Sequence, residues 1–326
     1  MNIAFAGLRH GHIFVLYNEA VNNPYYNICG AFEENSEARK NAEQNGVICN
    51  YETLDDLLRD DNVDVVALGG CYGDRAEVAI KALNAGKHVI TDKPLCVSET
   101  ELAAIKEAAQ RNKRLVSCMY TMRFEPIIRG VKAIVESGAL GEINNVYFGG
   151  QHPLQYGRRP MWYFKKGKHG GVINDIAIHG IDILSFALGV DVTDCYSARS
   201  WNKFAIEQPE FKDCGQFMLA GSKNEGIIAD VSYAIPDGVE FALPYYWDFR
   251  VWGTKGVMNF SLGENKGEYY IKGDANPHAI EPITPECEYL TDFYRYVNGE
   301  KNVILTMEEV FCATEKTLKI NAVAEN

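Results

Sequence analysis

Three polar residues, Asp175, His179 and Asp182, lie in an otherwise apolar stretch that follows two adjacent glycines. The apolar residues from 172 to 188 recur at helical spacing, which predicts a buried helix that ends at Gly189. At about 100° per residue, the three polar side chains would share one face of that helix. Burying a carboxylate or an imidazole without a partner costs several kcal/mol, so this row needs an explanation.

Three interpretations of the row are open from these residues alone. It could be a structural Asp–His pair inside a core. It could bind a divalent metal ion, because carboxylate and imidazole groups are common metal ligands. It could also be a proton-transfer pair, in which a carboxylate orients an imidazole that titrates near working pH. The helix alone does not distinguish these three interpretations, and motifs elsewhere in the chain are needed to do so.

Size and composition limit the classes of function. The chain has 326 residues, of which 47% are hydrophobic, and this is enough for two domains. The formal net charge is -12 and no long basic run is present, so nucleic acid is not expected as a partner. No apolar run reaches the roughly 18 residues of a membrane helix. The nine cysteines are scattered, and the first residues read as a strand rather than a secretory leader, so we expect a cytoplasmic protein with reduced thiols.

The first 120 residues alternate short apolar segments with amphipathic ones. We expect strands at 3–6, 27–32, 63–68, 88–91 and 115–118, and helices at about 13–22, 36–45, 54–59, 75–85 and 99–112. Continuous apolar strands that alternate with helices predict a doubly wound parallel sheet. Ligands bind such sheets at the carboxyl ends of the strands.

The first strand runs into a loop where a dinucleotide-binding fold carries G-x-G-x-x-G. Its residues are Gly7, Leu8, Arg9, His10, Gly11 and His12. Arg9 stands at the second glycine position and His12 at the third, so a cofactor loop and a plain turn are equally compatible with this segment. Glu33, at the end of the second strand, is placed to accept ribose hydroxyls, although an ordinary acidic turn would also explain it. Because Glu33 and Glu34 together would repel a 2′-phosphate, they favour NAD over NADP.

Two further strand ends face the same edge of the predicted sheet. Asp92, Lys93 and Pro94 follow the strand at 88–91, and Pro94 restricts Lys93 to extended geometry. Gly69 and Gly70 follow the strand at 63–68, and we expect the residues at both strand ends to line a cofactor. Taken by itself, a lysine in this position is more often a solvated loop charge.

The second half of the chain has a different pattern. A helix is expected at 124–137 and a strand at 143–149, followed by strands near 192–201, 213–220, 226–233, 246–252, 256–262 and 268–272. Glycine, proline and asparagine turns separate these strands, which is typical of a mostly antiparallel sheet. Two helices, near 286–298 and 307–323, close the chain. Thr306 and Glu309 form a capping box for the last helix, as Ser98 and Glu101 do for the helix at 99–112.

The order of these motifs resembles the Gfo/Idh/MocA family of NAD(P)-dependent sugar and polyol oxidoreductases. Four features carry the resemblance. The first two are the Gly7 loop with an acid after the second strand, and Gly86-Lys87-His88-Val89 followed by Asp92-Lys93-Pro94, which is similar to the family's G-K-H-V…E-K-P with Asp in place of Glu. The other two are Arg123-Phe124 with Pro126, and Gly170-Gly171 with Asp175, His179 and Asp182. The likeness runs from residue 1 to the last helices.

The resemblance implies a Rossmann domain over residues 1–121 and a C-terminal α+β domain over 122–326 with an open, mostly antiparallel sheet. The last helices could return to the first domain. It also implies that Lys93, Asp175 and His179 are the catalytic residues and that the cofactor is NAD, with NADP possible. The substrate would be a sugar, a polyol or a derivative. In this family the open sheet commonly forms the dimer interface, so a homodimer or homotetramer is expected.

Aromatic and arginine side chains suit sugar substrates, by stacking and by bidentate hydrogen bonds. We expect Tyr120, Arg123, Trp162 and Tyr163 to contact the substrate, whereas simple packing would also explain them. We expect no metal ion at the catalytic row, because Lys93 would bring a cation close to it. Two alternative functions stay open: a glycosidase-type enzyme that retains its NAD, and a non-catalytic protein that binds NAD or a sugar and regulates a partner.

Overall fold

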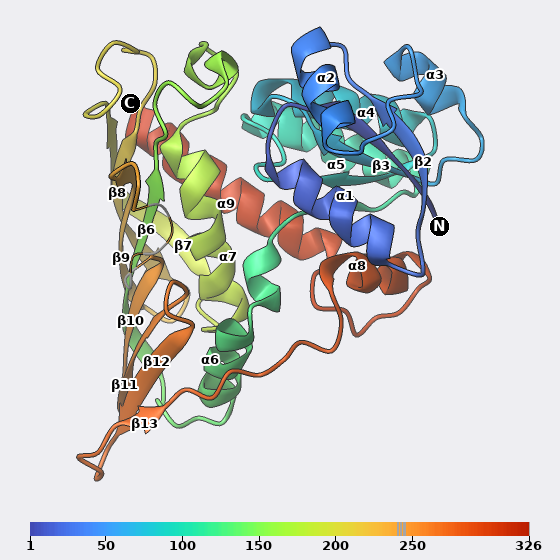
Figure 1. Cartoon of the computed structure of the whole chain (residues 1–326). Coiled ribbons are helices and arrows are strands. Elements are labelled where there is room, and N and C mark those ends of the chain that lie inside the picture. Colours follow the sequence, from blue (N-terminus) through green and yellow to red (C-terminus); the bar gives the residue numbers. More distant parts are fainter. Residues whose placement is uncertain (240, 242, 244–245, 326) are drawn as a thin grey trace. The chain divides into compact units, whose positions relative to one another are not determined.

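The computed structural model describes residues 1–239, 241, 243 and 246–325 (Figure 1). It divides into two compact units, each with its own β-sheet. The N-terminal unit consists of Met1–Met119, Gly167–Gly170 and Cys287–Glu315. The C-terminal unit consists of Tyr120–Lys166, Gly171–Glu286 and Lys316–Asn326. A short segment from the middle of the chain and a longer one near its end therefore complete the N-terminal unit.

The N-terminal unit is built on a five-stranded parallel sheet in the order β2-β1-β3-β4-β5. The strands are β1 (Asn2–Leu8), β2 (Asn27–Phe32), β3 (Val65–Gly69), β4 (His88–Thr91) and β5 (Val116–Cys118). The sheet confirms the predicted doubly wound architecture. The strand order reverses between β1 and β3, and a crevice for a ligand is expected at the carboxyl ends of these two strands.

Helices surround this sheet, and all of them except the short η1 lie where the sequence pattern predicts. They are α1 (His12–Asn22), α2 (Ser36–Gln44), α3 (Leu54–Arg59), η1 (Tyr72–Asp74), α4 (Arg75–Asn84), α5 (Glu99–Asn112), α8 (Tyr289–Val297) and the first part of α9 (Met307–Glu325). The predicted box before α9 is confirmed, because Thr306 N donates to Glu309 Oε2 at 2.9 Å and Glu309 N to Thr306 Oγ1 at 3.3 Å. Among the described residues, no helix combines the length and the apolar character needed to cross a membrane.

The C-terminal unit contains an eight-stranded sheet in the order β13-β12-β11-β10-β6-β9-β8-β7. Its strands are β6 (Ile143–Pro153), β7 (Val192–Trp201), β8 (Cys214–Gly221), β9 (Gly226–Ile235), β10 (Asp248–Gly253), β11 (Gly256–Ser261), β12 (Lys266–Ile271) and β13 (His278–Ala279). All neighbours pair antiparallel except β6 and β9. The predicted open, mostly antiparallel sheet is confirmed, and β6 extends four residues beyond its predicted end.

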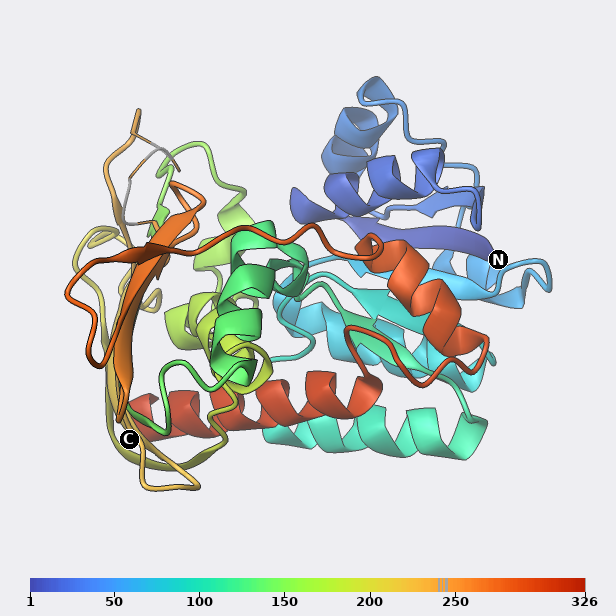
Figure 2. The ribbon, with the colours of Figure 1, turned by 90° about the horizontal axis from the view of Figure 1, so that it is seen from below.

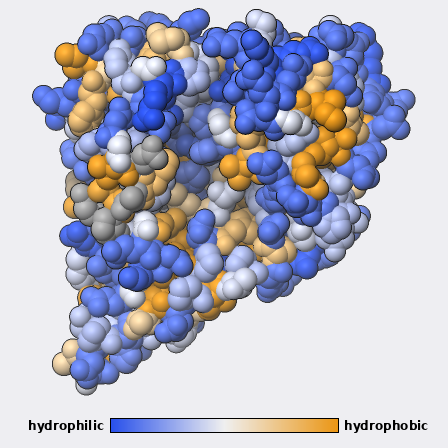
Figure 3. All heavy atoms as spheres, in the orientation of Figure 1, coloured by the Kyte–Doolittle hydropathy of each residue, from blue (hydrophilic) through white to orange (hydrophobic). Residues whose placement is uncertain are grey.

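Helices cover one face of the large sheet. Figure 2 shows α6 (Pro126–Glu136) and α7 (Ile178–Phe186) on the same side of it. On the other face, Ile228 of β9 is 58% exposed and lies opposite Tyr147 of β6 and Met218 of β8. Elsewhere, on the face of the molecule that Figure 3 shows, apolar side chains form separate patches among polar ones. The exposed row on β6, β8 and β9 is therefore a candidate contact surface.

Two of the predicted helices differ from the structure in detail. The helix expected at 124–137 begins at Pro126, preceded by η2 (Thr121–Phe124), because proline favours the first helical position and disfavours helical geometry in the residue before it. The helix expected at 172–188 contains a π-helical turn, η4 (Ile173–Ala177), before α7 begins. A π turn holds more residues than an α turn, so the 3.6-residue spacing used to place Asp175 above His179 does not apply there.

Candidate functional site

The glycine loop of the N-terminal unit brings the end of β1 against the end of β3. Gly7 has a φ of 77°, and a Cβ built on it would lie 2.8 Å from the backbone of Gly70. The backbone amides of Arg9 and His10 both donate to Gly69 O at 3.0 Å. The structure thus joins the loop residues with Gly69 and Gly70, as the sequence predicts, and only glycine fits position 7 without a shift of the chain.

Glu33, the expected acceptor for ribose hydroxyls, already has three hydrogen bonds. Its carboxylate accepts from Leu8 N at 2.5 Å, from Arg9 Nε at 2.8 Å and from Asn35 N at 2.8 Å. The residue is only 3% exposed. Arg9, which stands where the motif has its second glycine, therefore extends across the end of β2 and covers this carboxylate.

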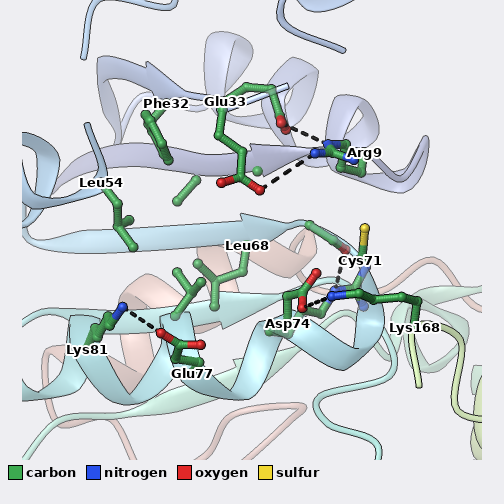
Figure 4. A pocket seen from close by; sticks show the side chains of 16 residues that line it. Arg9, Phe32, Glu33, Leu54, Leu68, Cys71, Asp74, Glu77, Lys81 and Lys168 are labelled. Atoms are coloured by element: carbon green, nitrogen blue, oxygen red, sulfur yellow. Dashed lines mark hydrogen bonds and ion pairs between the residues drawn. The ribbon is translucent and has the colours of Figure 1, made fainter. Parts of the chain in front are cut away.

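A cavity of about 410 Å³ opens beside this loop (Figure 4). Phe32, Leu54, Leu68 and Val78 give it apolar walls. Ion pairs surround it: Arg9 with Glu33, Lys81 Nζ with Glu77 Oε1 at 2.6 Å, and Lys168 with Asp74. An apolar slot with a charged rim at the carboxyl ends of parallel strands is what the adenosine half of a dinucleotide requires. The residues present therefore fit such a cofactor.

Lys168 reaches this cavity although it lies 94 residues after its partner Asp74. The segment Gly167–Gly170 packs against η1, where Gly73 N donates to Lys168 O at 3.0 Å. A Cβ on Gly73 would meet Gly167 O at 1.9 Å, so this close approach requires glycine. Lys168 could not be identified from the sequence, where the lysines that precede the two glycines are the one available signal.

Lys93 follows β4 and is itself buried. Its neighbour Asp92 is fully buried and contacts Arg75, with Nη2 2.9 Å from Oδ2, as well as two imidazoles. His12 Nδ1 lies 3.1 Å from Asp92 Oδ1, and His10 Nδ1 contacts Oδ2. Burial would raise the pKa of Asp92, but the neighbouring His10 and Arg75 hold that pKa well below its usual value. Burial lowers the pKa of His10 to about 4, so this imidazole is neutral at pH 7.

The same cluster has the composition of a metal site. The ligand atoms of His10, His12 and Asp92 all lie within 4.8 Å of one another. A divalent ion bound there would sit beside the buried guanidinium of Arg75, which already pairs with the carboxylate. Charge repulsion therefore weighs against a metal ion, and we interpret the cluster as a hydrogen-bonded support for the turn that carries Lys93.

The two adjacent glycines, of which Gly170 belongs to the N-terminal unit and Gly171 to the C-terminal unit, make the tight turn that the sequence predicts, with φ of 81° at Gly170 and 90° at Gly171. The π turn that follows points Asp175 at Tyr233 of β9, whose hydroxyl donates to Asp175 Oδ2. Burial, with the Asp175 charge, raises the pKa of Tyr233 well above its usual value, so the phenol keeps its proton. Tyr233 was not identified from the sequence, because nothing local links a strand tyrosine to this helix.

His179 lies against Trp247, with ring centroids 5.9 Å apart and nearly perpendicular planes. His152 contacts the same indole at 6.2 Å, also edge to face. Trp247 is fully buried. The imidazole of His179 is thus oriented by a buried aromatic neighbour, and a second histidine contacts the same indole.

Asp182, the third residue of the row, pairs with Arg123. Arg123 Nε lies 2.9 Å from Asp182 Oδ2 and Nη2 lies 2.7 Å from Oδ1, and both side chains are buried. Three further residues expected to contact the substrate, Tyr120, Trp162 and Tyr163, are also buried in this unit. Arg159 lies over the rings of Tyr163 and Tyr233, at 4.7 and 5.2 Å.

Comparison with known proteins identifies both parts of the chain. Residues 1–120 match the model of an oxidoreductase family with an NAD-binding Rossmann fold, GFO_IDH_MocA, and residues 128–259 match the GFO/IDH/MocA C-terminal domain. Inositol 2-dehydrogenase of Salmonella paratyphi B is 32% identical over 142 residues, which are 43% of this chain and 40% of that protein. The scyllo-inositol 2-dehydrogenase (NAD(+)) of Bacillus subtilis is 26% identical over 206 residues, 62% of this chain and 56% of that protein.

The matches to these curated relatives thus span about half of their length. Among solved structures, an NAD-binding protein from Listeria innocua superposes with a TM-score of 0.82 at 22% identity. That superposition covers 99% of this chain and 97% of the other. At this level of identity it supports the fold of the whole chain rather than a particular activity.

Proposed function

Because the chain belongs to the GFO/IDH/MocA oxidoreductase family, we propose that it is an NAD(P)-dependent dehydrogenase. The proposed reaction transfers a hydride between the nicotinamide and a secondary hydroxyl or keto group of a sugar, a polyol or a derivative. The names of the inositol dehydrogenases among its relatives support this substrate class.

The observation that carries the proposal is the cavity at the carboxyl ends of β1 and β3. There the approach of Gly7 to Gly70 leaves no room for a side chain, and a slot with apolar walls opens beside the loop. Lys93 leaves the same edge of the same sheet, at the end of β4. A dinucleotide held along this edge would lie next to the lysine that the family resemblance assigns to catalysis.

Oxidation of a secondary alcohol must remove a hydride from carbon and a proton from oxygen. The bound nicotinamide supplies the hydride acceptor. We assign the proton to His179, which takes it from the hydroxyl in oxidation and returns it in reduction. Lys93 orients the hydroxyl and stabilises the alkoxide charge as it develops. Asp175, held by Tyr233, positions the substrate.

Titration with NADH and NADPH by fluorescence or calorimetry, followed by a screen of inositols and aldoses at 340 nm, tests the proposal. Lys93→Ala and His179→Ala should each lower turnover by at least about a hundredfold, a typical loss for such groups, with dinucleotide affinity within about threefold of the parent. His278→Ala serves as the control, since His278 also pairs with an aspartate, Asp274, at 3.0 Å. Full turnover in either catalytic variant would remove the assignment.

A parallel screen of glycosides, read by release of the free sugar rather than by NADH, separates the alternative functions. A glycosidase that retains its NAD would turn over a glycoside without net NADH. A regulatory protein would bind the dinucleotide or a sugar and turn over neither class of substrate. We further propose that the chain self-associates through the exposed face of the large sheet, where Tyr147, Met218 and Ile228 lie in one row across three strands.

A further inference from the structure

We propose that Arg9, and not Glu33, meets the adenosine ribose of the cofactor, and that the chain therefore binds NADP(H) at least as tightly as NAD(H). The inference rests on the proposed function, because it assumes that the cavity beside the glycine loop takes a dinucleotide. It concerns which group of this chain contacts the 2′ position of the ribose.

A strand-end carboxylate selects NAD by accepting hydrogen bonds from the ribose hydroxyls, and its charge repels a 2′-phosphate. Glu33 is poorly placed for either role. Three donors from its own unit, Leu8 N, Arg9 Nε and Asn35 N, already occupy its two oxygens. Its side chain is 1% exposed, and the guanidinium of Arg9 neutralises its charge.

Arg9 presents the opposite chemistry to the cavity. It lines the cavity with its side chain 21% exposed, and Glu33 engages only its Nε. A guanidinium has five N–H donors in a planar fork, so four remain for other acceptors. A phosphate can accept two of them side by side, which is the strongest common arrangement between an arginine and an anion. Figure 4 shows Arg9 joined to Glu33, which fixes the direction of the guanidinium, so a 2′-phosphate bound there would meet a preoriented donor.

The remaining acidic groups do not reverse this preference. Glu34 Oε1 lies 3.7 Å from Arg9 Nη2, and its side chain is 78% exposed, so water screens its charge and it can turn away. Asp74 and Glu77 also line the cavity, and each is paired with a lysine. Pairing leaves the lining nearly neutral overall, and Arg9, which follows β1 and pairs with Glu33 after β2, is the group that decides which anion is accepted there.

Fragments of the cofactor isolate this contact. Calorimetry of the full chain would measure the Kd of NADPH, NADH, 2′,5′-ADP and 5′-AMP for the parent, Arg9→Ala and Arg9→Gln. We expect the parent to bind NADPH at least as tightly as NADH. Arg9→Ala should raise the Kd of NADPH and of 2′,5′-ADP at least tenfold and should leave the Kd of 5′-AMP within threefold. The Kd of NADH should stay the same or fall, because Glu33 is then uncovered. Arg9→Gln keeps a hydrogen-bond donor without the charge, so its Kd values should lie between those of the parent and those of Arg9→Ala.

Arg39→Ala is the matched control. It removes a guanidinium from the same unit, where Arg39 pairs with Glu43 at 3.2 Å outside the cavity lining, and it should change none of the four Kd values. A parent that binds NADH more than twofold tighter than NADPH would overturn the inference and leave the proposed function standing. Equal losses of affinity for 2′,5′-ADP and 5′-AMP in Arg9→Ala would also overturn the inference. Failure of the parent to bind either dinucleotide would instead remove the proposed function.

Discussion

Arg75 and Asp92 form a fully buried ion pair, with Nη2 of the arginine 2.9 Å from Oδ2 of the aspartate. Arg75 Nη1 also donates to Asp92 O at 2.7 Å and to Pro94 O at 2.9 Å. These two carbonyls flank Lys93, so one guanidinium holds the turn on both sides of the proposed catalytic lysine. The aspartate that replaces the glutamate of the family's E-K-P motif thus has a matching partner in this chain.

Removing Arg75 should destabilise the protein strongly. Arg75→Leu leaves the Asp92 carboxylate buried without its cation, and losing one partner of a buried pair costs about 3–5 kcal/mol in free energy of unfolding. Urea denaturation followed by circular dichroism measures this cost. Lys81→Ala breaks the exposed pair with Glu77 and should cost less than about 1 kcal/mol. Equal costs for the two variants would show that Arg75 does not hold this turn.

Glu19 should make stability fall as the pH rises. Its Oε1 accepts from Leu290 N at 2.6 Å, and burial raises its pKa to about 7 from an ordinary value of 4.5. Because the folded state holds the proton more tightly than the unfolded state, stability decreases between pH 4.5 and 7. Glu19→Gln should abolish this decrease and be more stable than the parent by about 2 kcal/mol at pH 8, after allowance for screening.

Urea unfolding at pH 5 and pH 8 checks the Glu19 prediction. Glu107→Gln is the control, since this exposed helix carboxylate pairs with Arg111 at 3.0 Å and its loss should leave the parent's decrease in stability between pH 5 and pH 8 unchanged. A Glu19→Gln variant that is no more stable than the parent at pH 8 would contradict the prediction.

Tyr233→Phe should affect both stability and turnover. It removes the hydroxyl that donates to the buried carboxylate of Asp175, and hydrogen bonds to charged groups contribute about 1.5–3 kcal/mol. We expect that loss in the free energy of unfolding and, with the polyol found by screening, at least about a tenfold loss in turnover at unchanged dinucleotide affinity. Tyr196→Phe, on an exposed side chain of β7, is the control and should match the parent in every measurement. Unaltered stability would exclude the proposed role of Tyr233.

Local patterns were sufficient to predict most elements of the fold. The parallel sheet follows from apolar strands that alternate with amphipathic helices. The helix that begins at Glu99 starts where it was predicted to, because Ser98 Oγ accepts a hydrogen bond from Glu101 N at 3.2 Å and so caps the helix. The tight turn at Gly170 and Gly171 could also be predicted, because two adjacent glycines permit positive φ at both positions.

Contacts between distant segments could not be predicted in the same way. The sequence identifies Glu33 as an acid after a strand, but not that Arg9 covers it, because that pair depends on how a loop and a strand end meet. The π turn that aims Asp175 at Tyr233 departs from the period used to place it. Lys168 enters the N-terminal unit through a close contact between Gly73 and Gly167, which no local pattern reveals.

The exposed face of the large sheet should mediate self-association. Ile228 lies at the centre of an apolar row, between Tyr147 and Met218, and near the exposed Trp252. Ile228→Asp places a charge in the proposed contact and should convert a dimer or tetramer to monomers in sedimentation velocity, since burying an unpaired carboxylate costs several kcal/mol. Val15→Asp, on an exposed residue of α1, is the control and should leave the assembly unchanged. A parent chain that sediments as a monomer, or an Ile228→Asp variant with the parent's mass, would show that this face is not the interface.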